Sequence, residues 1–539
     1  MRLRIGLDFD NTIANYDSAF PVVAKQLGLS TTAANKRELK RELFKEVNGE
    51  DSWQRVQGLA YGRFISLASL NPGVLEFIIR SRVRDSELFI VSHKTEFGHF
   101  DETETPLRDA ATNWLIEKRI LGAGALQIPS ESVFYTSTRL EKLEKIRDLE
   151  LDVFIDDLSE VLVDALFPVR TKKVLFRGGG DAESFGDNQV VTMSSWRDLS
   201  EHFFGEIKAN DVLYAANYVW PSLSPQAVER VDGRGNSKIF KLLTERGPAA
   251  LKIYPEKTVD RRPRRETEWS ALNFLYANKF QVPEPIGTDI DLDWSILEWV
   301  SGVSGTYDSA SKIHLASDFI RALYDASKPL DPNNNFSLAT EACLTPSTVV
   351  EQIQDRLFEL KKIQGTDLQT FLSKDLEPCL VEKLHRAKFM LGEKFSDCLD
   401  RRFWVLSPSD FGLHNSIITE SGDVVFFDFE YFGWDDPVKL TADFCHHPGM
   451  SLSLEEQKKW IDWSQNIFKD DSEFLHRLSA LFPLYAIRWA LIILNEFRPD
   501  KIKNRLNAES RIASEVIETQ LRQLEKAKLM IMNLDRSPI

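Results

Sequence analysis

Two groups of carboxylate and amide side chains, widely separated in the chain, contain the residue types that phosphate chemistry uses. Asp8 and Asp10 follow an apolar run near the start, and Asp410, Asn415 and Asp428 form a second group. Paired carboxylates bind Mg²⁺ and supply nucleophiles or general acids and bases. The first group predicts a site that removes a phosphoryl group, and the second predicts one that attaches it.

Length and charge limit the classes of protein to which this chain can belong. A chain of 539 residues exceeds the size at which a single hydrophobic core stops growing, so two or three domains are expected. The formal net charge of -15 argues against nucleic acid as a partner, because that binding requires a basic surface. Small anionic substrates fit, because a local cationic pocket or Mg²⁺ reverses the field of an acidic protein.

The chain start and the cysteine content indicate a soluble, cytoplasmic protein with no membrane partner. Asp8 follows Met-Arg-Leu-Arg so closely that the apolar region of a signal peptide has no room. No window approaches about 18 uncharged apolar residues, the length of a spanning helix. The cysteines show no CxxC spacing, so reduced thiols are expected rather than a zinc ribbon or a disulfide framework. They are Cys343, Cys379, Cys398 and Cys445.

The first part of the chain alternates short apolar runs with helical patterns. This rhythm predicts a doubly wound α/β domain with a parallel sheet over residues 1–205, closed by a helix at 196–204. The polar helical stretch at about 16–70 is too long for a crossover and predicts a helical cap that excludes water and selects substrate. The apolar runs cover residues 3–9, 87–92, 132–135, 153–157, 173–176 and 190–193.

The second part has a different pattern, and we expect the domain boundary near residues 205–212. Its start predicts a small lobe with antiparallel strands at 239–243, 249–254 and 295–300 and a charged helix at 264–278. The rest is largely helical, with a small strand pair flanking Asp410 and Asp428. Residues 206–539 therefore predict a two-lobed α+β domain.

The first group of carboxylates is expected at one edge of the parallel sheet. Asp8 and Asp10 are two residues apart, so a strand places both on one face, and the turn after them lets both approach one ligand. Ser92 and the pair Asp156-Asp157 end two further strands. Ligands of open α/β sheets bind at the carboxyl ends of the strands, where these groups converge. Each element alone is common, since Asp-x-Asp occurs in loops and Asp-Asp often begins a helix.

Over residues 1–205 the chain resembles the haloacid dehalogenase superfamily of phosphotransferases, whose first motif is Asp-x-Asp-x-Thr or Val after an apolar strand. Here Asn11 and Thr12 place the threonine one step nearer to the second aspartate. The second aspartate favours a phosphatase over a dehalogenase, which lacks that acid. A domain of this type that binds phosphate without turning it over is the alternative.

The resemblance implies a role for each matching residue. Asp8 is the nucleophile that forms an aspartyl-phosphate, and Asp10 protonates the leaving oxygen and later activates water. Ser92 binds the phosphoryl oxygens. Lys142, with Lys145 as the second choice, screens charge between nucleophile and phosphate. The implied Mg²⁺ ligands are Asp8, the backbone carbonyl of Asp10, Asp156 and Asp157.

In the second group, a strand lysine and a helix glutamate precede the carboxylates. Lys252 lies in mid-strand, where its charge requires a partner, and Glu268 on the following helix can supply it. No Gly-x-x-x-x-Gly-Lys-Ser/Thr loop occurs, which argues against a P-loop kinase. Asp410 and Asn415 are five residues apart in a loop, and Asp428 follows after a strand. A polar hairpin with turn-forming side chains is the structural alternative.

This order resembles the aminoglycoside phosphotransferase and choline kinase branch of the protein-kinase-like fold, over about residues 206–539. That branch reads His-x-Asp-x-x-x-x-Asn, but Pro408 stands here in place of the histidine, which leaves the bracing of the loop in question. The resemblance implies ATP as cofactor, with Asp410 orienting the acceptor hydroxyl and Asn415 and Asp428 holding Mg²⁺. Lys252, paired with Glu268, binds the phosphates.

Further positions follow from the same resemblance. Gly235, in Gly233–Ser237, is a candidate for the nucleotide-covering loop, although an ordinary hairpin turn is an equal alternative. Glu298 marks the segment between the lobes whose backbone meets adenine. Asp443 fits a downstream aspartate that supports the catalytic loop, or else a helix cap.

Three features are set aside. His414 is interpreted as structural. The adjacent His446 and His447 lack the spacing of a helical metal site. The basic run at 261–265 is a candidate for holding an anionic substrate, but a solvated helix start is favoured.

The leading prediction is a bifunctional enzyme. Its first domain is a Mg²⁺-dependent phosphatase of a small phosphorylated substrate, and its second is an ATP-dependent kinase of a small-molecule hydroxyl, such as that of a sugar. One alternative is a phosphatase regulated by a nucleotide-binding pseudokinase. Another is a phosphatase that acts on the kinase product or on phosphoprotein.

Overall fold

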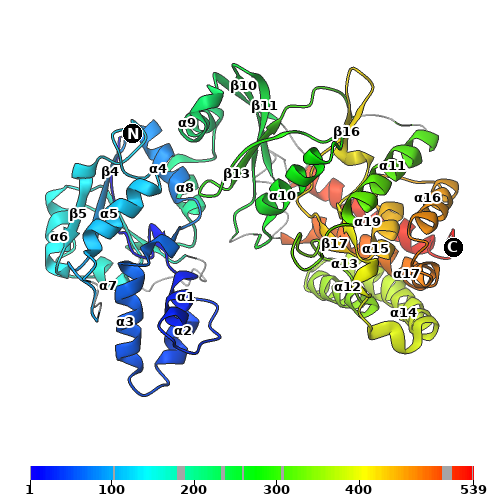
Figure 1. Ribbon diagram of the computed structural model, residues 1–539, viewed down its shortest axis with the longest axis horizontal. Coiled ribbons are helices and arrows are strands. Elements are labelled where there is room, and N and C mark those ends of the chain that lie inside the picture. Colours follow the sequence, from blue (N-terminus) through cyan, green and yellow to red (C-terminus); the bar gives the residue numbers. More distant parts are fainter. Residues whose placement is uncertain are drawn as a thin grey trace.

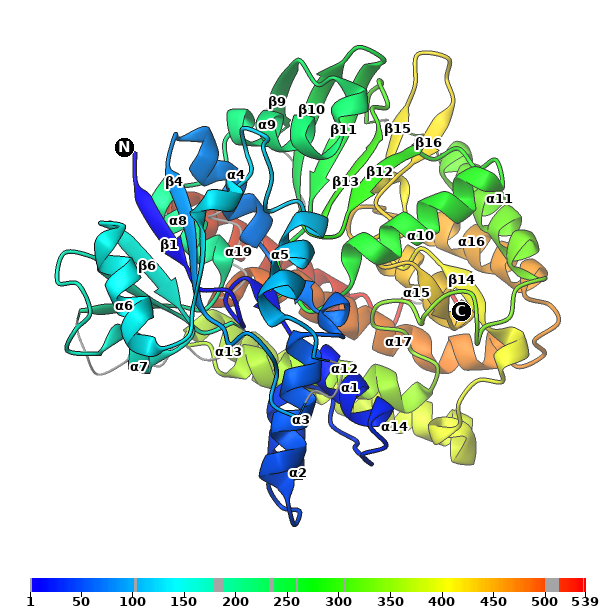
Figure 2. The ribbon, with the colours of Figure 1, turned by 60° about the vertical axis from the view of Figure 1, so that its left-hand side comes forward.

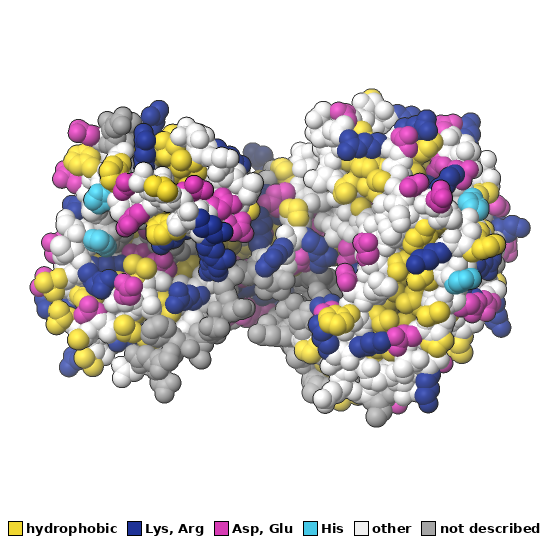
Figure 3. All heavy atoms as spheres, turned by 90° about the horizontal axis from the view of Figure 1, so that it is seen from below, with side chains coloured by type: hydrophobic (Ala, Val, Ile, Leu, Met, Phe, Trp, Pro, Cys, Tyr) yellow, Lys and Arg dark blue, Asp and Glu magenta, His cyan; other side chains and the backbone are white. Residues whose placement is uncertain are grey.

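The computed structural model describes residues 2–100, 104–178, 189–231, 237–257, 260–304, 307, 309–499, 513–536 and 538–539. Two halves lie side by side, an α/β half coloured blue to cyan and a two-lobed half coloured green to red (Figure 1). A narrower middle separates them on the face seen in Figure 3.

The α/β half is built on a six-stranded sheet in the order β5-β4-β1-β6-β7-β8, and every neighbouring pair is parallel. The predicted parallel sheet is confirmed. Its strands are β1 (Arg4–Leu7), β4 (Glu87–His93), β5 (Val133–Thr136), β6 (Val153–Asp156), β7 (Lys172–Phe176) and β8 (Val190–Met193). The helices are α4 (Val74–Val83), α5 (Leu107–Glu117), α6 (Arg139–Asp148), α7 (Ser159–Leu162) and α8 (Trp196–Phe204).

Both faces of this sheet are buried, which explains the continuous apolar runs of its strands. Successive residues point to opposite faces. Ile90 and Ile155 therefore join one core cluster, whereas Val91 and Phe154 join another. At Gly6 an added Cβ would lie 2.4 Å from Leu151 and 2.6 Å from Phe154, so the tight packing of that second face requires glycine.

A helical insert follows β1 directly and projects away from the sheet (Figures 1 and 2). Its two short strands pair antiparallel at the base, where Ala14 faces Leu70. The helices pack through aromatic rings, with Phe20 in contact with Trp53 and Tyr61. The elements are β2 (Ala14–Asn15), α1 (Ala19–Gln26), α2 (Lys36–Leu43), α3 (Gly49–Tyr61), η1 (Ile65–Leu67) and β3 (Ser69–Leu70).

The small lobe is an antiparallel sheet in the order β12-β13-β11-β10-β9. The predicted pairing of the two strands joined by the Gly-Pro turn is confirmed, since Ile239 faces Lys252. Helix α10 packs against β12 and β13 (Figure 2). The elements are β9 (Ala227–Val231), β10 (Lys238–Thr244), β11 (Gly247–Ile253), α10 (Arg264–Ala277), β12 (Pro285–Asp289) and β13 (Trp294–Glu298).

Helix α9 (Ala209–Val219) connects the two halves. It contacts α4 on one side and β9 on the other. One core cluster runs without a break from the α/β sheet through Val212 and Ala216 of α9 to Phe240 and Leu251 of the small lobe. The expected boundary between residues 205 and 206 therefore lies between helices of one continuous core. A salt bridge of 2.6 Å between Arg119 Nη2 and Asp289 Oδ2 adds a polar contact.

The large lobe is helical around two small strand pairs, so the predicted two-lobed α+β arrangement is confirmed. Its helices are α11 (Ser309–Ser327), α12 (Pro346–Lys361), α13 (Thr366–Phe371), η4 (Leu372–Leu376), α14 (Glu377–Leu391), η5 (Gly392–Ser396), η6 (Arg401–Phe403), η7 (Leu413–Asn415), α15 (Pro437–His446), α16 (Leu454–Ile467), α17 (Phe474–Ile493), η8 (Leu494–Phe497) and α19 (Ala513–Met532). Its strands are β14 (Val405–Ser407), β15 (Ser416–Ile418), β16 (Val424–Phe426) and β17 (Gly433–Asp435).

The segment Phe474–Phe497, which contains α17, is the most apolar helical stretch of the described chain. Its mean hydropathy of 1.6 and its length match those of a membrane-spanning helix. The sequence analysis did not predict this match, because it searched only for windows of uncharged apolar residues. Within the fold, 78% of its most apolar window is buried. A core helix of a large lobe has the same composition, because it contacts apolar neighbours on all sides.

Candidate active sites

The first site gathers three carboxylates at the carboxyl ends of β1 and β6. Oxygen atoms of Asp8, Asp156 and Asp157 lie within 4.8 Å of one another. Lys142, on α6, reaches between them, with its Nζ 2.7 Å from Asp8 Oδ1 and 2.7 Å from Asp156 Oδ2. The structure thus brings together Asp8, Lys142, Asp156 and Asp157, four of the residues that the sequence predicted for this edge. Lys145 instead lies over the ring of Phe134.

Charge at this site is unbalanced, because one lysine faces three carboxylates. Burial raises the pKa of Asp8 well above its usual value, Lys142 opposes that rise, and Asp156 adds to it. Burial and the charge of Asp156 raise the pKa of Asp157 to about 7. Burial lowers the pKa of Lys142, but the negative charges of Asp8 and Asp156 outweigh that effect, so the pKa of Lys142 is raised. Such a cluster of oxygen ligands fits Mg²⁺, whose charge would stabilise the ionised carboxylates.

The Asp10 carboxylate contacts one residue of the insert and a lysine that follows β4. Tyr16 donates to Asp10 Oδ1 at 2.8 Å, and Lys94 Nζ lies 2.9 Å from Asp10 Oδ2. Asn11 has a φ of 60°, so the chain turns sharply after Asp10. The sequence analysis missed Tyr16 and Lys94. Lys94 is two residues after Ser92, and this spacing along β4 was the available signal.

Two buried hydroxyl groups near this edge lack hydrogen-bond partners among the described residues. They are Ser92 Oγ and Thr12 Oγ1. The register pairs Leu7 with Ile90, so Ser92 lies two residues further toward the edge that carries Asp8. Buried polar groups are normally paired, so an unpaired hydroxyl here fits a ligand oxygen that completes the site.

The insert also contributes a lysine. Lys36 Nζ, on α2, donates to Asn11 Oδ1 at 2.7 Å and to Tyr61 Oη at 3.0 Å. Asn11 Nδ2 in turn donates to Asp157 Oδ2 at 3.1 Å. The cap predicted at 16–70 therefore reaches the carboxylates through a short chain of hydrogen bonds.

The second site is centred on Lys252 of β11. Its Nζ lies 2.9 Å from Glu268 Oε2, 2.6 Å from Asp428 Oδ1 and 3.4 Å from Glu430 Oε2. The helix glutamate and the strand lysine that the sequence paired are thus in contact. Burial raises the pKa of Asp428 to about 6, Lys252 opposes the rise and Glu430 adds to it.

Arginines at the start of α10 extend this network. Arg264 forms an ion pair with Glu430 and another with Asp260. Arg265 Nε lies 2.9 Å from Asp293 Oδ1. Both arginines are buried, so the preference for a solvated basic run was wrong for these two residues, whereas Arg261 is exposed. The arginines of this run form ion pairs with carboxylates that lie up to 166 residues away along the chain.

The loop after β14 carries Asp410. Asn415 Nδ2 donates to the backbone carbonyl of Asp410 at 3.0 Å, which closes the loop. The backbone N–H of Phe427 donates to the carbonyl of Asn415 at 3.0 Å, so Asn415 and Asp428 come from adjacent chain segments. Ser409 has a φ of 67° and directs the chain into this turn.

Two histidines hold the Asp410 carboxylate. Nε2 of His447 and of His414 lie 3.2 and 3.3 Å from Asp410 Oδ1, and the two rings are stacked with centroids 3.9 Å apart. Burial raises the pKa of Asp410, but the hydrogen bonds to the two rings outweigh it and hold that pKa far below its usual value. The sequence analysis set both histidines aside. His447 braces the loop in which Pro408 replaces the expected histidine.

Beneath the loop lies a buried ion network. Lys439 Nζ lies 2.9 Å from Asp435 Oδ2 and 3.1 Å from Asp443 Oδ2, and it donates to Ser409 Oγ at 3.4 Å. Asp443 also accepts from Trp489 Nε1 at 2.7 Å. Asp443 lies inside α15 rather than at its start, so a helix cap is not its role.

Two predicted nucleotide residues remain. Glu298 ends β13 and is exposed, and its Oε2 accepts from the backbone N–H of Glu284 at 3.1 Å. After it the chain leaves the small lobe. Gly235 lies outside the described residues, although the neighbouring Ser237 donates to Glu430 at 3.3 Å. The assignment of both residues to the nucleotide stays a prediction.

Comparison with known proteins assigns the second half to a class. Residues 227–439, which include Lys252, Glu268, Asp410, Asn415 and Asp428, match the model of the phosphotransferase enzyme family. Within residues 227–439 the chain is therefore similar to that family. The match supports phosphotransferase activity and does not extend to residues 1–226.

Solved structures are similar to the chain over 60–64% of its length. An ethanolamine kinase of Plasmodium vivax has 16% identity and a TM-score of 0.42, over 64% of this chain and 96% of its own. The choline kinase LicA of Streptococcus pneumoniae has 14% identity and a TM-score of 0.40, over 60% and 99%. A spectinomycin phosphotransferase has 9% identity and a TM-score of 0.42, over 61% and 99%. No curated protein matches the chain.

Proposed function

We propose that the protein is a bifunctional enzyme, with a Mg²⁺-dependent phosphomonoesterase in residues 1–205 and an ATP-dependent kinase of a small-molecule hydroxyl in residues 206–539. The observation that carries the kinase is the contact of Lys252 with Glu268 and Asp428 inside the segment that matches the phosphotransferase family. The observation that supports the phosphatase is the contact of Lys142 with both Asp8 and Asp156.

In the kinase reaction the chain mainly positions charge, because the transferred phosphoryl group needs little covalent help. Lys252, fixed by Glu268, binds the ATP phosphates. Asn415 and Asp428 would hold Mg²⁺, which supplies positive charge to the phosphate oxygens. Asp410 accepts a hydrogen bond from the acceptor hydroxyl and aligns it. The two imidazoles keep that carboxylate ionised, so it acts as an orienting group and only weakly as a base.

In the phosphatase reaction Asp8 attacks phosphorus, and the bond to the ester oxygen breaks as Asp10 gives that oxygen a proton. Asp10, now a carboxylate, takes a proton from water, which attacks the aspartyl-phosphate and releases inorganic phosphate and Asp8. Lys142 balances the charge of the nucleophile, and Ser92 donates to a phosphoryl oxygen. Asp156 and Asp157 would hold Mg²⁺ together with Asp8.

Two single substitutions test this division. Asp8→Asn should abolish hydrolysis of p-nitrophenyl phosphate and leave ATP-dependent transfer intact. Asp410→Asn should do the reverse, with ATP binding by calorimetry retained. The acceptor panel should contain sugars, choline, ethanolamine and aminoglycosides. Loss of both activities in either variant, with the fold intact by circular dichroism, would contradict two independent sites.

A pseudokinase that regulates the phosphatase is the second candidate, favoured by Pro408 in the catalytic loop. ATP binding without transfer to any acceptor, together with a change in phosphatase rate, would establish it.

A further inference from the structure

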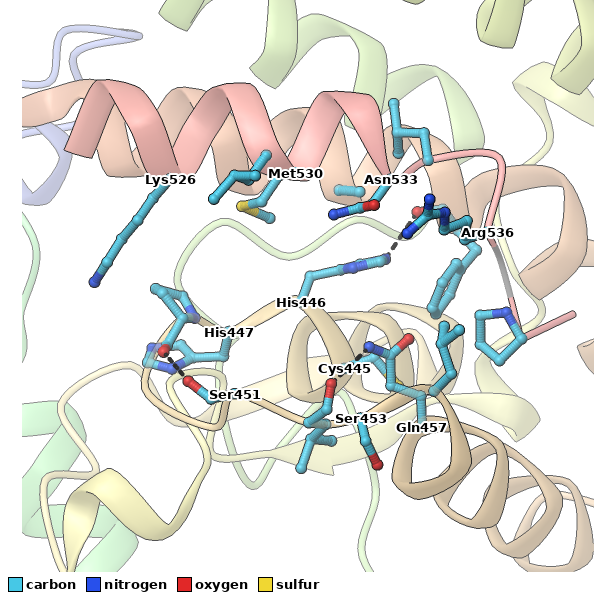
Figure 4. Close-up of a pocket in the computed structure, with 18 of the residues that line it drawn as sticks. Cys445, His446, His447, Ser451, Ser453, Gln457, Lys526, Met530, Asn533 and Arg536 are labelled. Carbon is cyan, nitrogen blue, oxygen red and sulfur yellow. Dashed lines mark hydrogen bonds between the residues drawn. The ribbon is translucent and has the colours of Figure 1, made fainter. Parts of the chain in front are cut away.

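A cavity of about 550 Å³ opens in the large lobe between α15, α16, α17 and the C-terminal helix α19 (Figure 4). This volume lies in the range of small-molecule sites. Its wall is apolar on the side of α17 and α19, where Phe482, Ala486, Ile493, Met530 and Leu534 face it.

The charges around this cavity have one sign. Lys526 and Arg536 line it, and none of the described lining residues is Asp or Glu. Figure 4 shows Lys526 at the end that holds His447 and Arg536 at the opposite end. Burial lowers the pKa of His446 to about 4, so that ring is neutral at pH 7. A cationic group inside the cavity would find no countercharge among the described lining residues, and one phenyl ring is too little for an aromatic cage.

The cavity adjoins the catalytic loop through His447. This ring lines the cavity, and its Nε2 lies 3.2 Å from Asp410 Oδ1. His414, stacked on the other side, holds the ring in place. A molecule in the cavity is therefore separated from the proposed hydroxyl-orienting carboxylate by one side chain.

We propose that this cavity holds the acceptor of the kinase reaction, and that the acceptor is an anionic molecule with an apolar portion. The inference rests on the proposed kinase function. The apolar portion packs between α17 and α19, and the anionic group pairs with Lys526 or Arg536. The hydroxyl reaches Asp410 past the edge of His447.

Binding and transfer are measured on the full-length protein with two panels. The anionic panel is 10-hydroxydecanoate, 3-(4-hydroxyphenyl)propanoate and glycerol 3-phosphate; the cationic panel is choline, ethanolamine and kanamycin. We expect calorimetric binding and ATP-dependent transfer with the anionic compounds that carry apolar groups. At least one of the variants Lys526→Gln and Arg536→Gln should raise KM for that acceptor about tenfold, the effect of losing a charged hydrogen bond, with kcat and the KM for ATP unchanged.

Lys528→Gln is the matched control. Lys528 lies on the same helix but pairs with Glu525 at 2.7 Å and does not line the cavity, so its variant should behave as wild type. Transfer to the cationic panel alone, or anionic binding that is insensitive to Lys526 and Arg536, would overturn the inference. Anionic binding that either variant weakens, without transfer to any acceptor, would uphold the ligand class and reject the kinase proposal instead.

Discussion

Lys142 is the single residue on which the first site depends, and its replacement by methionine gives the sharpest test. Its side chain is 1% exposed, and its two partners, Asp8 and Asp156, are 8% and 0% exposed. Methionine keeps the apolar stem and removes only the charge. Removing one partner of a buried ion pair leaves uncompensated carboxylates and costs about 3–5 kcal/mol.

Lys383 on α14 provides a matched control. It is 5% exposed and also contacts two carboxylates, Asp535 at 2.6 Å and Glu382 at 2.8 Å, but these are 85% and 71% exposed. Water solvates both after the lysine is lost, so Lys383→Met should cost at most about 1 kcal/mol.

Hydrogen–deuterium exchange in urea measures the local stability around each lysine. It is followed on peptides from β1 and β6 for Lys142→Met and on peptides from α14 for Lys383→Met. We expect protection to fall roughly a hundredfold or more in the first variant and less than about tenfold in the second. Equal losses in the two variants would refute the reasoning that partner burial decides the cost.

The pH dependence of Lys142→Met has a definite sign. Asp8 already has a raised pKa in the folded protein, and loss of the lysine raises it further. A group whose folded pKa lies above its unfolded value loses stability as pH rises through the folded pKa. The loss should therefore be larger at pH 8 than at pH 5, and millimolar Mg²⁺ should reduce it at pH 8.

Two further outcomes concern the same edge of the sheet. Ser92→Ala should lower phosphatase kcat/KM about a hundredfold. The melting temperature should stay the same or rise, because Ser92 Oγ has no hydrogen-bond partner among the described residues. A fall in stability without a fall in rate would show that the hydroxyl is structural. Apparent Mg²⁺ affinity should weaken as pH falls below about 7, where Asp157 takes up a proton. Asp157→Asn should reduce that dependence in a titration followed by phosphatase rate and leave the part that Asp8 contributes. An unchanged pH profile in the variant would remove Asp157 from the metal site.

Local patterns in the sequence were sufficient for the sheet and for much of both sites. Buried parallel strands leave continuous apolar runs, and their carboxyl ends share one edge, so Asp8 and Asp156 were expected to meet. A charged lysine in mid-strand needs a partner, and the next helix supplied Glu268 one crossover away. These inferences succeed because they depend only on nearby residues. The period of a strand is visible within a few residues, and a buried charge in a strand needs a partner that the next element can supply.

Contacts that close over long separations were decided only by the tertiary structure. The pairing of His447 with Asp410 and of Arg264 with Glu430 cannot be predicted from any local spacing in the sequence. The solvation predicted for the basic run fails at Arg264 and Arg265, because Glu430 and Asp293 reach them from distant segments of the chain. Whether a charged side chain is buried depends on which surfaces pack against it, and that choice is made by the whole core rather than by the neighbours in the chain.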